Sequence, residues 1–244
     1  MLEHLKRLEE LRGEGRQRAD FLAEILRVKR WQKRRLSYTY RDLAADTRFA
    51  PPTAFFLDEL YGDAPSALRD RDLIRMYPTM QRLLPKFASA TVSSALALDV
   101  LSEEFDQALA KQLRGEEITN LRYCQAFRDV GRKAERLRQV VLMQQVGEGL
   151  DAVVKKPLLY STLKMLRRPS KLAGLGEMQR FLEAGFSAFR HMKGASPFLH
   201  TIAARETALI EAIFGGQMPD LPCDELDLRP DDALTDDAPE PGAG

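Results

Sequence analysis

The chain has 244 residues and a formal net charge of +1, with 44% hydrophobic and 30% charged residues. A chain of this length forms one large domain or two small ones and can bury a substantial core. Its apolar stretches stay far shorter than the roughly 18 residues that cross a bilayer, and its two cysteines are too few for a disulfide framework or a metal cluster. The charged N-terminus has no apolar signal core, so we expect a cytoplasmic protein without a transmembrane segment.

Helical periodicity dominates the chain, and strand alternation of useful length is absent from the sequence. Residues 1–15 predict a short helix and a linker, because Gly13 and Gly15 interrupt the helical pattern. From about residue 16 to 45 the apolar positions fall mostly at steps of three and four, which predicts one long helix.

An aromatic-rich segment follows this helix. Pro51 and Pro52 stand where a first helical turn tolerates proline, and Gly62 stands where a left-handed cap often ends a helix. The residues between them are so apolar that a short helix here must be buried on most of its circumference, so we predict a plug in the core. Its members are Phe55, Phe56, Leu57, Leu60 and Tyr61.

The same periodicity predicts the remaining helices. They are a helix over about 70–84 bent by Pro78, a long helix over about 87–113, a helix capped by Thr119 that runs through Val130, its continuation to about Val154, a short helix between Pro157 and Pro169, and helices over 175–192 and 196–214. Gly131 either breaks or weakens the pattern, and Gly185 would let a neighbouring helix approach closely. We therefore predict one all-α domain of eight or nine helices over residues 16–218.

The end of the chain differs from the rest in charge. Residues 219–244 carry nine acids and one base, so this segment has a charge of about −8 and the rest of the chain about +9. Five prolines and few core-forming residues accompany the acids, which predicts a disordered acidic tail.

Histidine is scarce, and no Glu-x-x-His pair of a helical di-metal site occurs in the sequence. His191 or His200 could ligate haem, or line a pocket for another apolar ligand, in a helical protein. The simpler interpretation of His191 is an interaction with carbonyls at the end of a helix. We expect no cofactor and keep the haem pocket as an alternative.

Three acids share one helical face, because Asp99, Glu103 and Asp106 lie at steps of four and three. Such a row could hold a divalent cation in a metal-dependent enzyme, which is a further alternative. Since only one row is present and its pattern is incomplete, we expect a solvated face and no metal. Nucleophile elbows and phosphate-cradling glycine loops are absent from the sequence, so no catalytic residue is assigned.

The sharpest positive feature is a basic run. Seven bases and no acid lie between Arg27 and Arg41, with aromatic residues among them. This pattern is typical of a face that contacts phosphates, although bases on the outer face of a helix are ordinary and a tryptophan can simply pack. The candidate contact residues are Lys29, Arg30, Trp31, Lys33, Arg34 and Arg35. The acidic tail of the same chain is an alternative partner for this basic face, and its binding would mask the face.

The segment Phe55–Gly62 resembles the Phe-Phe-Leu-x-x-Leu-Tyr signature of an uncharacterised proteobacterial family, a domain of unknown function. Ile74–Pro78, Leu83–Pro85, Ala97–Glu104 and Phe189–Met192 are also similar to that family, so the resemblance spans roughly residues 16–214. It implies a helical domain in a bacterial cytoplasm, and it carries no catalytic or binding residue over to this chain.

These observations favour a non-enzymatic binding or regulatory protein that acts through a helical surface with a basic face. The expected partner is another protein, and a nucleic acid or an anionic surface is the alternative. The sequence leaves the oligomeric state open.

Overall fold

The computed structural model describes residues 1–60, 86–165, 167–172 and 174–222. Across these residues the chain is helical and contains no strand, with eleven α-helices of which eight have at least seven residues. The prediction of an all-α fold is therefore confirmed. No helix in the described part of the chain is long and apolar enough to cross a membrane.

The helices follow one another closely along the chain. They are α1 (Leu2–Gln17), α2 (Ala19–Thr39), α3 (Arg41–Ala45), α4 (Ala50–Phe55), the π-helix η1 (Phe56–Leu60), α6 (Lys86–Gln112), α7 (Asn120–Val130), α8 (Lys133–Val154), α9 (Pro157–Met165), α10 (Arg167–Leu172), α11 (Gly176–Met192) and α12 (Ser196–Phe214).

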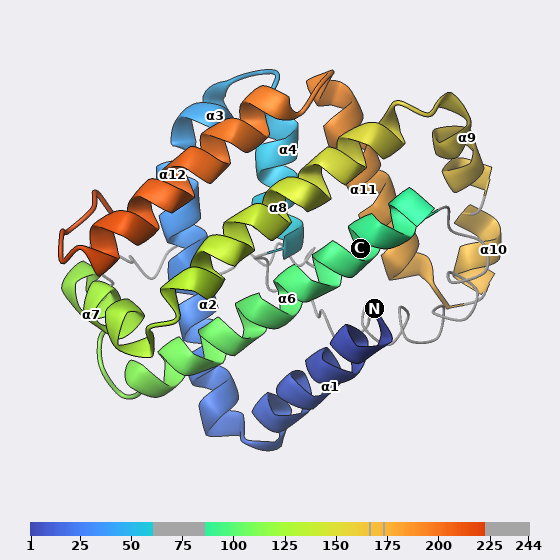
Figure 1. The fold of residues 1–244 in the computed structure, drawn as a ribbon. Helices are drawn as coiled ribbons and strands as arrows, with labels where there is room; N and C mark the ends of the chain where they lie inside the picture. The colour runs from blue at the N-terminus through green and yellow to red at the C-terminus, as the bar shows by residue number, and fades with distance from the viewer. Residues whose placement is uncertain (61–85, 166, 173, 223–244) are drawn as a thin grey trace, which may run out of the picture.

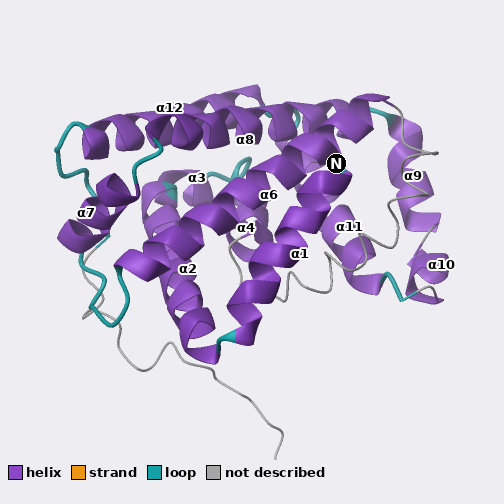
Figure 2. Cartoon of the chain, turned by 60° about the horizontal axis from the view of Figure 1, so that its bottom comes forward, coloured by secondary structure: helices purple, strands orange, loops and turns teal. Residues whose placement is uncertain are grey.

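Two layers make up the body of the protein. Helices α12, α8, α6 and α1 lie side by side in that order, and α2, α4 and α11 lie behind them (Figure 1). Helices α9 and α10 stand at one end of the molecule, next to α11 (Figure 2). They therefore lie outside the two layers.

The N-terminal segment is part of this body. Helix α1 continues through Gly13 and Gly15 and ends only at Arg18, whose backbone is extended. Its buried leucines Leu5, Leu8 and Leu11 pack with residues of α6. The predicted linker before residue 16 is thus wrong, because burial of this leucine stripe outweighs the cost of roughly 1 kcal/mol for each glycine in a helix.

The long helix predicted over 16–45 is divided into three parts. The chain leaves helical geometry at Arg18 and again at Tyr40, where φ is −111° and ψ is 20°. Tyr40 is buried, and its hydroxyl donates a hydrogen bond of 2.6 Å to Glu206 of α12. A tertiary contact therefore accompanies the break that local periodicity did not predict.

Several other boundaries match the predictions. Helix α6 spans the predicted region, and the Thr119 hydroxyl caps α7 by accepting a hydrogen bond from the Arg122 amide. Gly131 does end α7, since its φ of 68° is a left-handed conformation that glycine adopts without strain. Pro169, which was expected to end a helix, lies inside α10. The helix predicted over 70–84 lies outside the described residues.

Part of the predicted aromatic plug packs against α11 and α12, with Phe55 buried and Phe56 and Leu57 half-buried. Phe55 is buried with its ring against Phe181 of α11, and Phe56 packs against Phe189 and Phe198. Gly185 of α11 lies directly under the Phe55 ring, in agreement with the prediction that a neighbouring helix approaches closely at this glycine. Leu57 is half-buried beside the same cluster, and Leu60 is the last residue of η1. Tyr61 and Gly62 lie outside the described residues.

The packed part of the chain extends further towards the C-terminus than predicted. Leu221 is buried in the largest core cluster, and the Tyr38 hydroxyl donates a 3.0 Å hydrogen bond to Asp220. The boundary at residue 219 is therefore corrected, because the residues up to Pro222 pack on the helices. The rest of the predicted tail lies outside the described residues.

Candidate functional site

The acidic row of α6 is an internal ion network. The side chains of Glu103 and Asp106 are only 5% and 9% exposed. Lys29 lies 2.8 Å from Glu103 and 3.5 Å from Asp106, and Arg12 pairs with Glu103 at 3.4 Å and with Asp99 at 2.8 Å. The expectation of a solvated face is wrong for Glu103 and Asp106, because cations from α1 and α2 cover them.

The two buried acids respond to this network in opposite ways. Burial raises the pKa of Asp106, and the nearby ammonium of Lys29 offsets only part of that rise. Burial also acts to raise the pKa of Glu103, but the Lys29 and Arg12 cations outweigh it, so the Glu103 pKa is lowered. The pKa of Lys29 is raised, since the two carboxylates outweigh the effect of its burial. Within the described residues no group of three or more His, Cys, Asp or Glu side chains is placed to hold a metal ion.

Two of the six candidate contact residues on α2 lie in the interior. Trp31 is 1% exposed and stacks on Tyr123, with ring centroids 3.9 Å apart. Arg35 is 6% exposed and forms an ion pair with Glu206 of α12. The prediction that Trp31 and Arg35 are surface contact residues is therefore wrong, because both lie in the core. Lys29 is already paired with Glu103 and Asp106 of the acidic row.

The other three candidates remain at the surface. Arg30 is exposed, Arg34 is half-exposed, and Lys33 lies 3.2 Å from Asp58 of η1. The basic face of α2 is therefore much smaller than the run of seven bases indicated. Its open cations are Arg30 and Arg34.

Both histidines named in the haem alternative lie at the surface of the described part of the chain. His191 and His200 are both exposed, and the His191 ring nitrogen Nε2 lies 3.0 Å from the Thr47 carbonyl oxygen. A shallow depression of about 310 Å³ lies between α4, η1 and α11, and neither histidine lines it. Thr47 lies in the turn after α3, so this contact differs from the predicted interaction of His191 with carbonyls at the end of its own helix.

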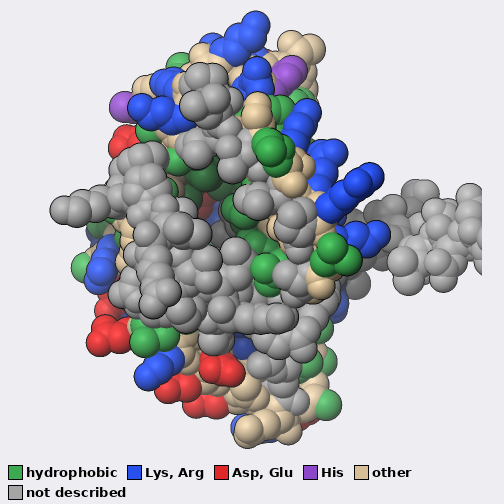
Figure 3. All heavy atoms as spheres, turned by 90° about the vertical axis from the view of Figure 1, so that its right-hand side faces the viewer, with side chains coloured by type: hydrophobic (Ala, Val, Ile, Leu, Met, Phe, Trp, Pro, Cys, Tyr) green, Lys and Arg blue, Asp and Glu red, His purple; other side chains and the backbone are tan. Residues whose placement is uncertain are grey.

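A second basic surface is carried by α9, α10 and the two residues before them, residues 155–165 and 167–172, which we call the α9–α10 lobe. The chain has six bases and no acid between Asp151 and Glu177. All six are exposed: Lys155, Lys156, Lys164, Arg167, Arg168 and Lys171. Figure 3 looks at this end of the molecule and shows Lys and Arg side chains gathered along one edge with hydrophobic side chains among them.

The lobe also presents two highly exposed hydrophobic residues. Met165 is 79% exposed and Leu172 is 90% exposed, more than any other large hydrophobic residue whose exposure the structure describes. Arg168 and Leu172 lie four residues apart in α10, so they share one face of that helix. Cations and apolar side chains therefore alternate on the same outer surface.

Polar and aromatic contacts fix the lobe to α11. The ring of Tyr160 stacks on Phe186, with centroids 5.1 Å apart. Gln179 is buried and donates a 2.6 Å hydrogen bond to the carbonyl oxygen of Leu163 near the end of α9. Both Nε and Nη2 of Arg167 in α10 donate hydrogen bonds to Glu183, and this hydrogen bonding lowers the pKa of Glu183 to about 2.

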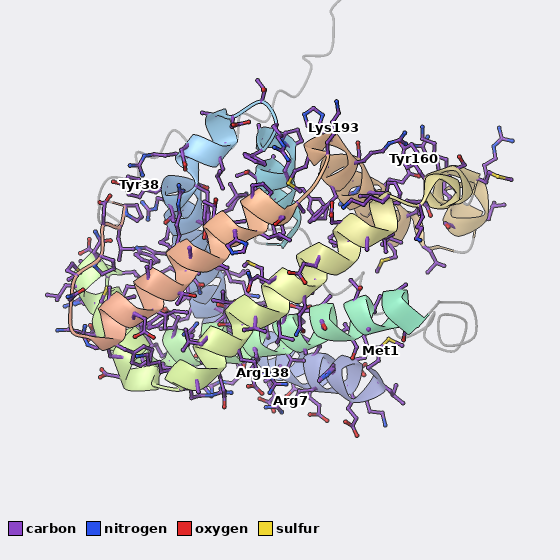
Figure 4. The ribbon with its side chains drawn as sticks, turned by 45° about the horizontal axis from the view of Figure 1, so that its top comes forward. Met1, Arg7, Tyr38, Arg138, Tyr160 and Lys193 are labelled. Atoms are coloured by element: carbon purple, nitrogen blue, oxygen red, sulfur yellow. The ribbon has the colours of Figure 1, made fainter. Side chains whose placement is uncertain are left out.

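The two basic surfaces lie at opposite ends of the molecule. Tyr38 marks the C-terminal end of α2, and Tyr160 marks α9 at the far side (Figure 4). Sequence reasoning missed the lobe, although its absence of acids was a readable signal. It singled out the longer basic run, whose neutralising acids come from distant helices.

Residues 12–219 match the model of a protein family described as a domain of unknown function (DUF8198). Neither a curated protein nor a solved structure matches the chain.

Proposed function

This chain belongs to the DUF8198 family, and we propose that it acts by binding an anionic macromolecule rather than by catalysing a reaction. We place it in the cytoplasm of a bacterium, and we keep the Phe-Phe-Leu-x-x-Leu-Tyr segment as the signature of the family. Part of that signature, Phe55 and Phe56, packs in the core, so it supports the fold rather than the contact.

One observation carries the proposal. The α9–α10 lobe presents six exposed bases and has no acid in its own sequence. Arg167 and Lys155 do pair with Glu183 and Asp151. For Lys156, Arg168 and Lys171 no carboxylate partner is found among the described residues, so their charge is available to an external anion.

Arg30 and Arg34 on α2 form the second, smaller part of the proposed contact. They are the residues of the original candidate face that keep an open charge. Arg35 is unsuitable for a binding test, because its removal leaves the Glu206 carboxylate without its cation inside the protein.

Retention on a heparin column tests the proposal, since heparin is a dense polyanion. A Lys156→Gln/Arg168→Gln/Lys171→Gln variant should elute at clearly lower salt than the unaltered protein. With three cations fewer, the variant displaces fewer counterions from the polyanion when it binds. An Arg30→Gln/Arg34→Gln variant should show a smaller reduction. A Lys6→Gln/Lys111→Gln/Arg138→Gln variant, with three exposed cations on α1, α6 and α8, is the matched control.

The result that contradicts the proposal is equally clear. If the unaltered protein fails to bind heparin at low salt, or if the control variant loses as much retention as the lobe variant, then the basic surfaces have no special role. Thermal unfolding of every variant should stay close to that of the unaltered protein, since the substituted side chains are exposed or, for Arg34, half-exposed.

A further inference from the structure

We propose that the anionic partner of the α9–α10 lobe is a lipid bilayer surface, with Met165 and Leu172 inserted among the lipids and the surrounding cations at the headgroups. This inference rests on the proposed function and names its partner.

The first argument is the chemistry of the lobe. Lys164 is adjacent to Met165 in the chain, and Arg168 shares a face with Leu172. Peripheral helices that lie on membranes combine Lys and Arg with Leu, Met or aromatic residues in this way, because the apolar groups enter the acyl boundary while the cations meet anionic headgroups. Water is a poor environment for side chains that are 79% and 90% exposed.

The second argument concerns shape and area. A stable protein–protein contact buries about 800 Å² on each partner, and α9 and α10 are helices of only nine and six residues. They stand at one end of the molecule, next to α11 (Figure 2). Two protruding apolar side chains suit a fluid bilayer, which needs no matching shape.

The third argument separates lipid from nucleic acid. Single-stranded nucleic acids are bound by exposed aromatic rings on which bases stack. The aromatic ring described in the lobe, that of Tyr160, is already stacked on Phe186 and lies next to the cations of Lys164 and Arg190. The exposed side chains of Met165 and Leu172 do not interact favourably with phosphates, so they would not strengthen binding to a nucleic acid backbone.

Vesicle co-sedimentation of the full chain tests this inference. The protein should bind vesicles made of equal parts phosphatidylglycerol and phosphatidylcholine, and it should bind pure phosphatidylcholine vesicles much more weakly. Each cation near an anionic bilayer is worth about a fivefold change in affinity. The Lys156→Gln/Arg168→Gln/Lys171→Gln variant should therefore lose roughly 100-fold.

The apolar residues provide the decisive comparison. A Met165→Ser/Leu172→Ser variant should bind the anionic vesicles at least about tenfold more weakly, while its retention on heparin stays unchanged. The matched control is Leu121→Ser/Val141→Ser, in which two other exposed hydrophobic residues, 53% and 49% exposed, are replaced on α7 and α8. This control should bind vesicles like the unaltered protein.

A fluorescence measurement checks insertion directly. The chain has one tryptophan, Trp31, and it is buried, so its emission should not respond to vesicles. A Leu172→Trp variant should show a blue shift when anionic vesicles are added, because the new indole leaves water for the acyl boundary.

The outcomes distinguish the two proposals. Heparin binding without vesicle binding, or vesicle binding that the Met165→Ser/Leu172→Ser variant retains in full, overturns the lipid inference and leaves a soluble polyanion as the partner. Failure of the unaltered protein to bind heparin at low salt overturns the proposed function and, with it, the lipid inference that rests on it.

Discussion

The ring of Phe55 lies directly over Gly185, so that a Cβ atom at position 185 would come within 2.8 Å of the Phe55 Cζ atom. The Phe55 ring is held on its other sides by Phe56 and Phe181. Helix α4 and the π-helix that follows it can therefore approach α11 closely only because residue 185 has no side chain. The aromatic signature and this glycine form one structural unit.

A Gly185→Ala substitution should destabilise the protein. Overpacking of a filled core costs about 1–3 kcal/mol, and the gain in helix propensity from glycine to alanine returns roughly 1 kcal/mol of this. We expect a net loss of about 1 kcal/mol in the free energy of unfolding, measured by urea denaturation.

The control for this prediction is Gly13→Ala. A Cβ atom at Gly13 meets nothing within 4 Å, and the residue is inside α1. This variant should gain up to about 1 kcal/mol from helix propensity alone. Equal stabilisation by both substitutions would show that Phe55 does not restrict position 185.

Glu103 and Asp106 should respond differently to removal of their charge. The Glu103 pKa is lowered in the folded protein, so ionised Glu103 stabilises the fold above its unfolded pKa, and this contribution is lost as the pH falls through its folded pKa. The Asp106 pKa is raised, so ionisation of Asp106 costs stability at neutral pH. Glu103→Gln should therefore lose about 3 kcal/mol, while Asp106→Asn should stay within about 1 kcal/mol of the unaltered protein.

Urea unfolding at neutral pH measures both variants. Lys29 keeps Glu103 as a partner when Asp106 is replaced, but loses its closer carboxylate when Glu103 is replaced. The prediction is wrong if Asp106→Asn proves the more damaging of the two.

The sequence predicted most of the fold because its helices have one dominant buried face. In α2 the stripe of Phe21, Ile25 and Val28 was readable, and all three residues are buried. The same steps of four and three continue to Gln32 and Arg35, which are buried as well. The buried face of α2 thus extends beyond its apolar residues. Extending the same spacing through the polar positions would have predicted that Arg35 is buried.

The ion partners could not be predicted in the same way. Lys29 meets Glu103 across 74 positions of sequence, and Arg35 meets Glu206 across 171. A local count of charges cannot detect such pairs, so the run between Arg27 and Arg41 indicated a larger exposed face than the structure has. In the α9–α10 lobe most bases lack such distant acids within the described residues, and a local count would have succeeded.

Leu221 should make the stability of the protein depend on where the acidic segment is cut. A chain that ends at Met218 loses the buried Leu221 side chain, which is 7% exposed, and the hydrogen bond between Tyr38 and Asp220. Full burial of a leucine is worth about 2 kcal/mol, so this chain should unfold at lower urea concentration.

A chain that ends at Pro222 is the matched control and should keep the full free energy of unfolding. It is also the correct chain for testing whether the acidic tail masks a basic surface, because it removes eight acids and keeps the described contacts of Asp220 and Leu221. Equal stability of the two shortened chains would refute a structural role for Leu221.

The Arg167–Glu183 pair should make the α9–α10 lobe sensitive to acid. Hydrogen bonding to Arg167 lowers the pKa of Glu183 from 4.5 to about 2, so the pair stabilises the lobe above pH 4.5 and this contribution is lost as the pH falls towards 2. Hydrogen exchange of the α10 amides, corrected for its intrinsic pH dependence, should therefore accelerate below pH 4.5. A Glu183→Gln variant keeps the shape of the side chain without its charge, and its exchange should be faster at neutral pH and lose this acid dependence. Identical pH profiles for the two proteins would show that Gln179 and the Tyr160–Phe186 stack hold the lobe without help from the ion pair.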